Sequence, residues 1–452
     1  MMAKYKTYPE YKDSGVEWLG EVPNHWKTVS ISRLFSRIKR TGYTEKELLS
    51  VYRDYGVIPK SSRDDNNNKP SEDLSPYQLV EPNDLVMNKM KAWQGSIAIS
   101  EYEGIVSPAY FVYKPNNILF ELAHPRYVHY LLRNPIYVTQ YLSRSKGIRV
   151  NQWDLDPDEF RNIELLLPDK TEQEKIYSFL DHETAKIDNL IEKQQQLIEL
   201  LKEKCQTVIS HAVTKGLNPD VPMKDSGVEW LGEIPTHWEM KRLAYLGSAR
   251  NGLTYSPENI TDQESGVLVL RSSNIQNSSL CFDDNVYVDS IIPEQFLVKE
   301  NDLLICSRNG SRNLIGKNAL ISKDAEGMAF GAFMAIFRSP LNTYIFWVLN
   351  SPLFDYQSGS FLTSTINQLT IGNLNSMEIP VPTLKEQKEI AQYLSRKNDD
   401  FIALINKVKD SITLLQERRT ALISAAVTGK IDVRDWVAPD TQNVEEPQEA
   451  TA

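Results

Sequence analysis

The sequence predicts an α+β fold with two pseudo-symmetric globular domains, each mixed α/β with a β-rich core, joined by two long antiparallel coiled-coil helices. Three observations predict this fold: an internal repeat, a long helical segment after each globular part, and apolar residues spaced as in a coiled coil. The chain has 452 residues, which is too long for one ordinary domain of about 100–200 residues. We therefore expect several structural units.

The repeat is visible in two pairs of segments. Residues 12–26 read KDSGVEWLGEVPNHW and residues 224–238 read KDSGVEWLGEIPTHW, so 13 of 15 positions match. Further on, LPDKTEQEKI at residues 167–176 aligns with VPTLKEQKEI at residues 381–390. Such self-similarity indicates a duplicated chain. The expected parts are domain 1 (1–168), the first helix and linker (169–222), domain 2 (223–382), the second helix (383–436) and a disordered acidic tail (437–452).

Within the two helical segments, residues 171–212 and 385–426 lack Pro and Gly and show a seven-residue repeat with a 3/4 split, which is typical of a coiled coil. The repeat positions are Leu180, Thr184, Ile187, Ile191, Gln194, Ile198, Leu201, Cys205, Val208 and Ala212 in the first helix, and Leu394, Asn398, Phe401, Ile405, Val408, Ile412, Leu415, Arg419, Leu422 and Ala426 in the second. Because the second helix starts from the second domain, pairing with the first requires an antiparallel arrangement. Two separate amphipathic helices, each packed on its own domain, are the alternative.

Composition limits the class of protein. The formal net charge is −10, which argues against a protein that coats DNA through bulk positive charge. It does not exclude specific DNA binding, because only the contact surface must be basic. The sequence has no apolar run long enough to span a membrane, and its three cysteines form no disulfide or zinc pattern. Its polar and aromatic start leads us to expect no signal peptide. We expect a cytoplasmic protein.

Basic, amide-rich loops are the candidate binding sites. In each half, a short strand that follows Asn-Asp (Asn83-Asp84, Asn301-Asp302) leads into such a loop. Arg and Lys side chains can hydrogen-bond guanine, and Asn and Gln can hydrogen-bond adenine. The predicted DNA-binding residues are Lys89, Lys91, Trp93, Gln94, Arg144, Lys146, Arg149, Asn151 and Gln152 in domain 1, and Arg250, Asn251, Arg271, Asn274, Arg308, Asn309, Arg312, Asn313, Lys317, Asn367 and Gln368 in domain 2. For any single residue, a solvated loop is the alternative, and Trp93 is as well suited to packing as to DNA contact.

No motif for catalysis is present. A DNA adenine methyltransferase needs N/D-P-P-Y/F, and the nearest sequence is Ser107-Pro108-Ala109-Tyr110, which lacks the first polar residue and the second Pro. The sequence contains neither a dinucleotide-binding nor a Walker motif, and no metal cluster. His25 and His237 lie between a Pro turn and a Trp in the repeated segment, where we expect a structural clasp. We therefore predict no catalytic residue and no metal site.

These features together resemble the DNA specificity (S) subunit of Type I restriction-modification enzymes, over the chain up to about residue 436. The resemblance depends on the SGVEWLGE(V/I)PxHW segment before each domain, the P-x-x-x-E-Q-x-x-I entry to each helix, and the domain–helix–domain–helix order. It implies that each globular part is a target recognition domain for one half of an asymmetric, bipartite site in double-stranded DNA. The helices become a spacer.

The resemblance also implies partners and their cofactors. Two modification (methyltransferase) subunits that use S-adenosylmethionine would dock on the helices and methylate adenine. Restriction subunits that use ATP and Mg²⁺ would add translocation and cleavage. This chain itself would bind no cofactor and contact no membrane. A free-standing DNA-binding regulator and a coiled-coil scaffold protein are the alternative functions.

Overall fold

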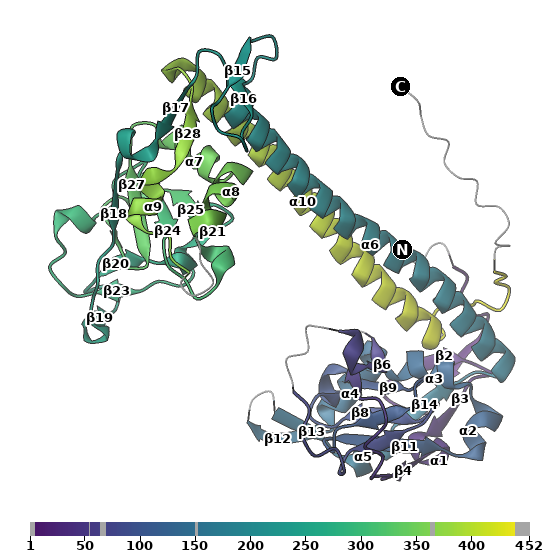
Figure 1. Ribbon diagram of the computed structural model, residues 1–452. Helices are drawn as coiled ribbons and strands as arrows, with labels where there is room; N and C mark the ends of the chain where they lie inside the picture. Colours follow the sequence, from purple (N-terminus) through teal and green to yellow (C-terminus); the bar gives the residue numbers. More distant parts are fainter. Residues whose placement is uncertain (1–4, 54, 64–68, 150–151, 362–366, 439–452) are drawn as a thin grey trace. The chain divides into compact units, whose positions relative to one another are not determined.

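The computed structural model (Figure 1) describes all residues except 1–4, 54, 64–68, 150–151, 362–366 and 439–452. The chain forms two compact units. Unit 1 comprises Met1–Gln194 and Asp410–Ala452, and unit 2 comprises Gln195–Lys409. Each unit contains one globular domain, domain 1 or domain 2, and part of each of two long helices.

Domain 1 is built around a four-stranded antiparallel sheet in the order β4-β11-β8-β9. Side chains of β8 alternate between two buried clusters, with Leu85 and Met87 in one and Val86 in the other, as expected for a strand covered on both faces. The strands are β1 (Tyr11–Asp13), β2 (Glu21–Pro23), β3 (Lys27–Ser30), β4 (Phe35–Ile38), β5 (Leu49–Tyr52), β6 (Gly56–Pro59), β7 (Gln78–Val80), β8 (Leu85–Asn88), β9 (Ile97–Ile99), β10 (Gly104–Val106), β11 (Tyr110–Pro115), β12 (Ser145–Arg149), β13 (Gln152–Leu155) and β14 (Glu164–Leu167). The helices are α1 (Ile31–Leu34), α2 (Asn117–Leu122), α3 (Pro125–Leu132), α4 (Pro135–Ser143) and α5 (Pro157–Arg161), with 3-10 turns η2 (Lys60–Ser62) and η3 (Ala92–Gln94).

Domain 2 repeats this frame, with a four-stranded sheet in the order β18-β27-β24-β25. Its strands are β15 (Met223–Asp225), β16 (Glu233–Pro235), β17 (Glu239–Arg242), β18 (Ser248–Asn251), β19 (Ile260–Thr261), β20 (Val267–Leu270), β21 (Ile275–Gln276), β22 (Ser279–Leu280), β23 (Tyr287–Val288), β24 (Leu303–Cys306), β25 (Asn318–Leu320), β26 (Ala329–Phe330), β27 (Met334–Arg338) and β28 (Glu378–Val381). The helices are α7 (Asn342–Leu349), α8 (Pro352–Phe361) and α9 (Ile371–Ser376), with 3-10 turns η4 (Leu243–Tyr245), η5 (Pro257–Asn259), η6 (Ser272–Asn274), η7 (Glu294–Phe296), η8 (Arg312–Leu314) and η9 (Lys323–Ala325).

The repeated Asn-Asp pair has the same structural role in both domains. Asn83 and Asn301 have φ values of 74° and 65°, a left-handed conformation that asparagine tolerates better than most residues. The following aspartates are buried and paired, Asp84 with Arg40 and Asp302 with Arg338. This turn therefore fixes the start of β8 and of β24, the strands that lead into the candidate loops.

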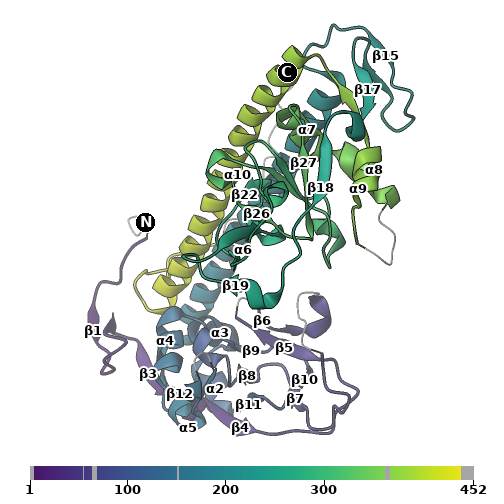
Figure 2. The same cartoon turned by 90° about the vertical axis from the view of Figure 1, so that its left-hand side faces the viewer.

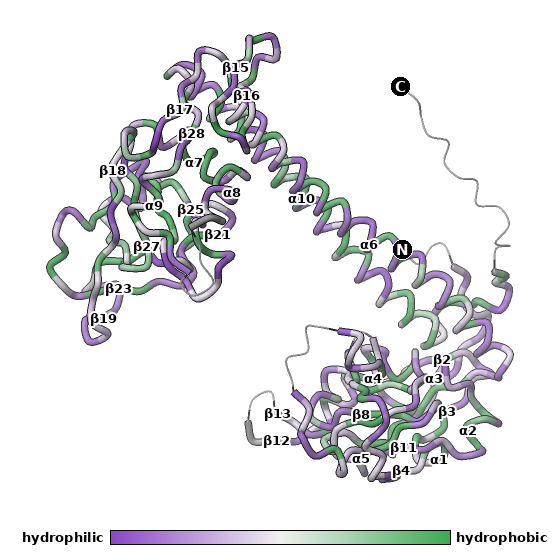
Figure 3. The backbone as a smooth tube through the Cα atoms, in the orientation of Figure 1, coloured by the Kyte–Doolittle hydropathy of each residue, from purple (hydrophilic) through white to green (hydrophobic). Residues whose placement is uncertain are grey.

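The long helices are α6 (Lys170–Lys215) and α10 (Leu384–Val427), and they lie beside each other in each unit (Figures 1 and 2). Between Ile191 and Val208 of α6, the residues that are not exposed are the six predicted coiled-coil positions, and α10 shows the same pattern between Asn398 and Val408. Hydrophilic and hydrophobic stretches accordingly alternate along both helices in Figure 3. The predicted coiled coil is confirmed. Within the described residues, no helix is long and apolar enough to cross a membrane.

Contacts in each unit show that the helices are antiparallel. In unit 1, Arg419 pairs with Asp188 at 2.9 Å, while Tyr127 Oη donates both to Val427 O and to Leu166 O, just before α6. In unit 2, Cys205 lies against Asn398, while Tyr344 Oη donates to Val213 O and to Pro380 O, just before α10. In both units the end of one helix therefore lies beside the start of the other, so the two helices run in opposite directions.

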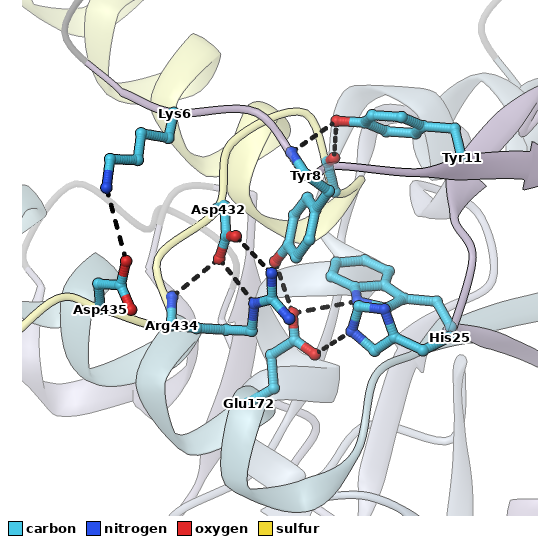
Figure 4. A network of polar contacts seen from close by, with 10 residues as sticks. Lys6, Tyr8, Tyr11, His25, Glu172, Asp432, Arg434 and Asp435 are labelled. Atoms are coloured by element: carbon cyan, nitrogen blue, oxygen red, sulfur yellow. Dashed lines mark hydrogen bonds and ion pairs between the residues drawn. The ribbon is translucent and has the colours of Figure 1, made fainter.

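The two repeated motifs bind each other at the start of each helix. In unit 1, His25 Nε2 lies 2.6 Å from Glu172 Oε2 (Figure 4), and Trp26 Nε1 donates to Glu172 Oε1 at 3.2 Å. In unit 2, His237 and Trp238 contact Glu386 in the same way, at 2.8 and 3.3 Å. We call this His-Trp-Glu arrangement the clasp. The structural role expected for the two histidines is consistent with it.

The unit 1 clasp has an additional layer, which the two ends of the described chain supply (Figure 4). Tyr8 Oη donates to Glu172 Oε1 at 2.6 Å, and the Arg434 guanidinium lies 5.1 Å from the centroid of the Tyr8 ring. Asp432 N donates to Lys6 O at 2.8 Å. Only 2% of the Glu172 side chain is exposed, whereas 29% of the Glu386 side chain is. The carboxylate of the unit 1 clasp is therefore more deeply buried than that of the unit 2 clasp.

Candidate nucleic-acid interface

The loop between β8 and β9 is the first candidate segment of domain 1. It contains the 3-10 turn η3, and Trp93 Nε1 donates to Met90 O at 3.0 Å within it. The turn ends at Gly95, whose φ of 94° is left-handed and strains other residues. A Cβ at this position would also lie 3.2 Å from Val138 Cγ2. Local turn chemistry and the packing of α4 together hold this loop in place.

The β12–β13 hairpin is the second candidate segment of domain 1, and it contacts the first. Leu155 N donates to Lys89 O at 3.2 Å, and the Trp93 and Trp153 rings meet edge to face with centroids 4.9 Å apart. Trp93 is thus a packing residue between the two loops, one of the two roles expected for it. Arg149 is opposite Gln152 in the hairpin register, while the side chains of these two residues, and Asn151 as a whole, lie outside the described residues.

A third segment, which sequence reasoning missed, is the end of β5. Arg53 follows this strand and is exposed, and a Cβ at Gly95 would lie 3.9 Å from its Cγ. Arg133 donates to Arg53 O at 2.6 Å and lies 2.9 Å from His129 Nε2. Burial, together with the nearby Arg133 charge, lowers the pKa of His129 to about 3. The His129 imidazole that contacts Arg133 is therefore uncharged near pH 7. We call residues 53, 88–96, 144–149 and 152–155 loop cluster 1.

Domain 2 brings together the corresponding three segments. Asn309 Nδ2 in the β24–β25 loop donates to Ser272 Oγ at 3.2 Å, and Lys317 Nζ donates to Ser272 O at 3.3 Å. On the other side of the loop, Asn367 Nδ2 donates to Gly310 O at 3.1 Å, and Arg308 forms an isolated bridge with Gln368. We call residues 271–274, 307–317 and 367–368 loop cluster 2. Arg271 follows β20 as Arg53 follows β5, so aligning LSVYR (49–53) with VLVLR (267–271) would have identified Arg53.

Asn274 requires a correction. It was predicted as a direct DNA contact, but it is fully buried. Its side chain accepts from Arg271 N at 2.9 Å and donates to Cys281 O at 3.0 Å, so its amide closes the loop around η6. A direct base contact by Asn274 is excluded in this conformation.

Arg250 and Asn251 lie on β18, paired with β27, rather than in one of the three segments. Arg250 donates to Gln295 at 2.9 Å and lines a shallow hollow with Lys299 and Arg338. None of the hydrogen bonds or ion pairs of the described residues links either residue to loop cluster 2. Their predicted DNA contact stays a prediction for a separate part of domain 2.

The candidate basic residues differ in how far they are already engaged. Ion pairs join Lys89 to Asp154 at 3.4 Å, Lys146 to Asp156 at 3.5 Å, and Arg271 to Asp284 at 2.9 Å, while Arg144 donates to Gln140. Lys91, Arg308 and Arg312 are exposed, and none of them forms an ion pair with any residue in the described ranges. Exposed ion pairs contribute only about 0–1 kcal/mol, so phosphate can replace them. The three unpaired cations need no such exchange, and are the strongest candidates for charged contact.

Known proteins resemble this chain over both of its halves. The family model described as "Type I restriction modification DNA specificity domain" matches twice, over residues 23–200 and 235–414. The type I restriction enzyme MjaVIII specificity subunit of Methanocaldococcus jannaschii is 26% identical over 434 residues, covering 92% of this chain and 95% of that protein. The EcoKI specificity subunit of Escherichia coli (strain K12) is 21% identical over 460 residues, covering 96% of this chain and 95% of that protein.

A solved structure shares the fold. It describes complex assembly and conformational transition of the type I R-M system, and one chain in it superposes with a TM-score of 0.67 at 15% identity, covering 90% of this chain and 98% of that one. The two matched copies of the family model each span one globular domain with part of a long helix. The chain therefore belongs to the Type I restriction-modification DNA specificity family.

Proposed function

We propose that this chain is the DNA-reading specificity subunit of a Type I restriction-modification complex, in which domain 1 reads one half of an asymmetric, bipartite DNA site and domain 2 reads the other. The observation that supports this most strongly is the pair of loop clusters. The same frame positions three polar segments in each domain, and the side chains on those segments differ. Two readers with one frame and different loops suit two different half-sites.

The paired helices also suit a partner-docking surface. Several large apolar side chains on α6 and α10 are exposed and lie outside the coiled-coil positions. They are Leu190 and Leu414 in unit 1, and Leu197, Leu200, Ile402 and Leu404 in unit 2. Exposed apolar groups that gather on one element are typical of protein interaction sites. We assign this surface to two modification (methyltransferase) subunits, with restriction subunits added in the complete complex.

The chemistry then belongs to the partners. S-adenosylmethionine would bind to the modification subunits, ATP and Mg²⁺ to the restriction subunits, and no cofactor to this chain, which acts with them on DNA in the cytoplasm. The test is reconstitution. The purified chain with S-adenosylmethionine should not methylate DNA, and adding the modification subunits should give adenine methylation at one asymmetric sequence. Methyl transfer by the isolated chain, free of contaminants, would contradict the proposal.

The helices should set the length of the non-specific spacer between the half-sites. An α-helix rises about 1.5 Å per residue, so four residues inserted next to Gln194 in α6 add about 6 Å, or between one and two base pairs. Sequencing the methylated sites of this variant should show a spacer longer by one or two base pairs with both half-sites unchanged. An active variant with the original spacer would show that the helices are not the ruler. The alternatives, a free-standing regulator or a scaffold, are not favoured, because 92% and 96% of the chain align with two specificity subunits over nearly their full length.

A further inference from the structure

Phe333 is an exposed aromatic residue at the edge of loop cluster 2. It lies between β26 and β27, and 60% of it is accessible to solvent, whereas Phe330 and Met334 on either side are buried. A single exposed apolar residue is ordinary on a protein surface. The position of Phe333 is unusual, because the loop next to it contains Arg308 and Arg312, two exposed arginines that form no ion pair with any described residue.

Phe333 is held to that loop through its backbone. Its carbonyl oxygen accepts hydrogen bonds from Ser307 N and Arg308 N, both at 3.0 Å, and from Ser307 Oγ at 3.0 Å. Met334 N donates to Gly331 O at 2.8 Å and closes the turn that contains the phenylalanine. The ring is therefore presented to solvent from a fixed backbone.

The Arg308 guanidinium lies over this ring. Its Cζ lies 5.5 Å from the centroid of the Phe333 ring, within the range in which a guanidinium and an aromatic face attract each other. Arg308 is exposed and has no carboxylate partner among the described residues. Its backbone is bridged to Gln368 on the opposite side. The backbone of Arg308 is therefore held in place, and its guanidinium has no carboxylate partner among the described residues.

We propose that Arg308 and Phe333 form a specificity-determining pair that reads a guanine and an adjacent thymine in the major groove. This rests on the proposed function. The guanidinium donates two hydrogen bonds to guanine O6 and N7, and the exposed part of the ring packs on the 5-methyl group of the thymine, both of which are established modes of base recognition. The ring also orients Arg308, because stacking restricts a guanidinium that otherwise samples many rotamers.

The experiment uses the complex of this chain with its modification subunits and DNA probes with single-atom changes. The half-site of domain 2 is the one that stays unchanged when domain 1 is replaced. In it, 7-deazaguanine removes the N7 acceptor and uracil removes the thymine methyl. Each change at the G–T step should weaken binding by the wild type, the guanine change by about tenfold.

The variants test whether the two residues act as a pair. Arg308→Ala should abolish the response to 7-deazaguanine, and Phe333→Ala should abolish the response to uracil and reduce the response to 7-deazaguanine. Phe333→Leu, which keeps an apolar contact without an aromatic face, should retain the uracil response and lose part of the guanine response. Ile291→Ala is the matched control, because Ile291 is an exposed large apolar residue of domain 2, and should behave as wild type.

Two results would overturn the pair while leaving the proposed function intact. One is a domain 2 half-site without adjacent guanine and thymine. The other is unchanged analogue responses in Arg308→Ala and Phe333→Ala complexes that still methylate the cognate site. Failure of the wild-type complex to bind or methylate any specific site would instead count against the proposed function.

Discussion

Domains 1 and 2 share a frame but support their loop clusters with different chemistry. Tyr127 in α3 and Tyr344 in α7 make equivalent hydrogen bonds, and from them His129 corresponds to Phe346 and Arg133 to Asn350. In domain 1, charged Arg133 links His129 to Arg53 O. In domain 2, Asn350 donates to Asn318 at 2.8 Å and accepts from Ser278 at 2.9 Å.

This difference shows that the two domains differ in the residues beneath their loop clusters as well as in the loops. The side chains that would face DNA differ, and so does the layer that positions them. A loop cluster and its support must therefore change together, whereas the strand order can stay. A whole domain should accordingly be exchangeable, while single loops should not.

The largest expected effect follows from this exchange. Strand β3 pairs with β14 at the base of domain 1, so residues 31–163 can be replaced as a block by those of another family member. The new block brings its own loops and supports, and one half-site should change completely while the other stays the same. Methylome sequencing of the reconstituted complex provides the measurement. A change in both half-sites, or a palindromic native target, would contradict independent readers.

The two clasps should differ in their contribution to stability. Glu172→Ala removes a buried carboxylate and leaves Tyr8 Oη and Trp26 Nε1 without their acceptor, which should destabilise unit 1 by about 3 kcal/mol. Glu386→Ala affects a more exposed site and should cost unit 2 about 1 kcal/mol. Urea titrations read by hydrogen exchange of peptides from each unit measure both. Exposed Glu174→Ala is the control, and equal losses in the two units would show that burial of the clasp does not matter.

The unpaired cations should contribute more to DNA affinity in domain 2 than in domain 1. Arg308→Ala with Arg312→Ala removes two cations from one loop, and Lys91→Ala removes one. If either arginine reads guanine, the double variant should lose about 1–3 kcal/mol and relax specificity at one position, whereas loss of phosphate contacts alone weakens all sequences evenly and lowers the salt dependence. Binding of the reconstituted complex at several salt concentrations separates these cases. Exposed Lys323→Ala is the control, and unchanged binding by the double variant would remove this loop from the interface.

Acid should destabilise domain 1 through His129, with no counterpart at Phe346 in domain 2. The pKa of His129 is about 3 in the folded domain, and an unfolded histidine titrates near pH 6.5. Below about pH 6.5 the unfolded chain therefore binds a proton that the folded domain does not, so this stability is complete above that pH and falls by up to about 1.4 kcal/mol per pH unit below it. His129→Phe, which introduces the domain 2 residue, should flatten the pH dependence of domain 1 unfolding, even if its stability at pH 7 is lower. Domain 2 peptides in the same hydrogen-exchange experiment serve as the control, and an unchanged slope would exclude His129.

Features that repeat along the chain, or that have a short period, are predictable from the sequence. The duplicated motifs predicted two similar domains, and the seven-residue spacing predicted the coiled-coil positions of α6 and α10, which are the positions withdrawn from solvent in the structure. Helical periodicity is a local property of the chain, so it can be read without knowing what the helix packs against. The basic loops after β8 and β24 were also visible, because their composition differs from the strands around them.

Which of these segments contact one another depends on the folded domains. His25 and Trp26 bind Glu172 across more than 140 residues, and both motifs were recognised without any sign that they are partners. Asn274 is withdrawn into its own loop by contacts within residues 271–285. Phe333, in contrast, reaches loop cluster 2 because β27 pairs with β24 in one sheet, and Arg53 lies at loop cluster 1 although β5 and β8 belong to different sheets. Contacts of this kind depend on the packing of the whole domain, which buries some polar groups and leaves others free, and no local pattern specifies them.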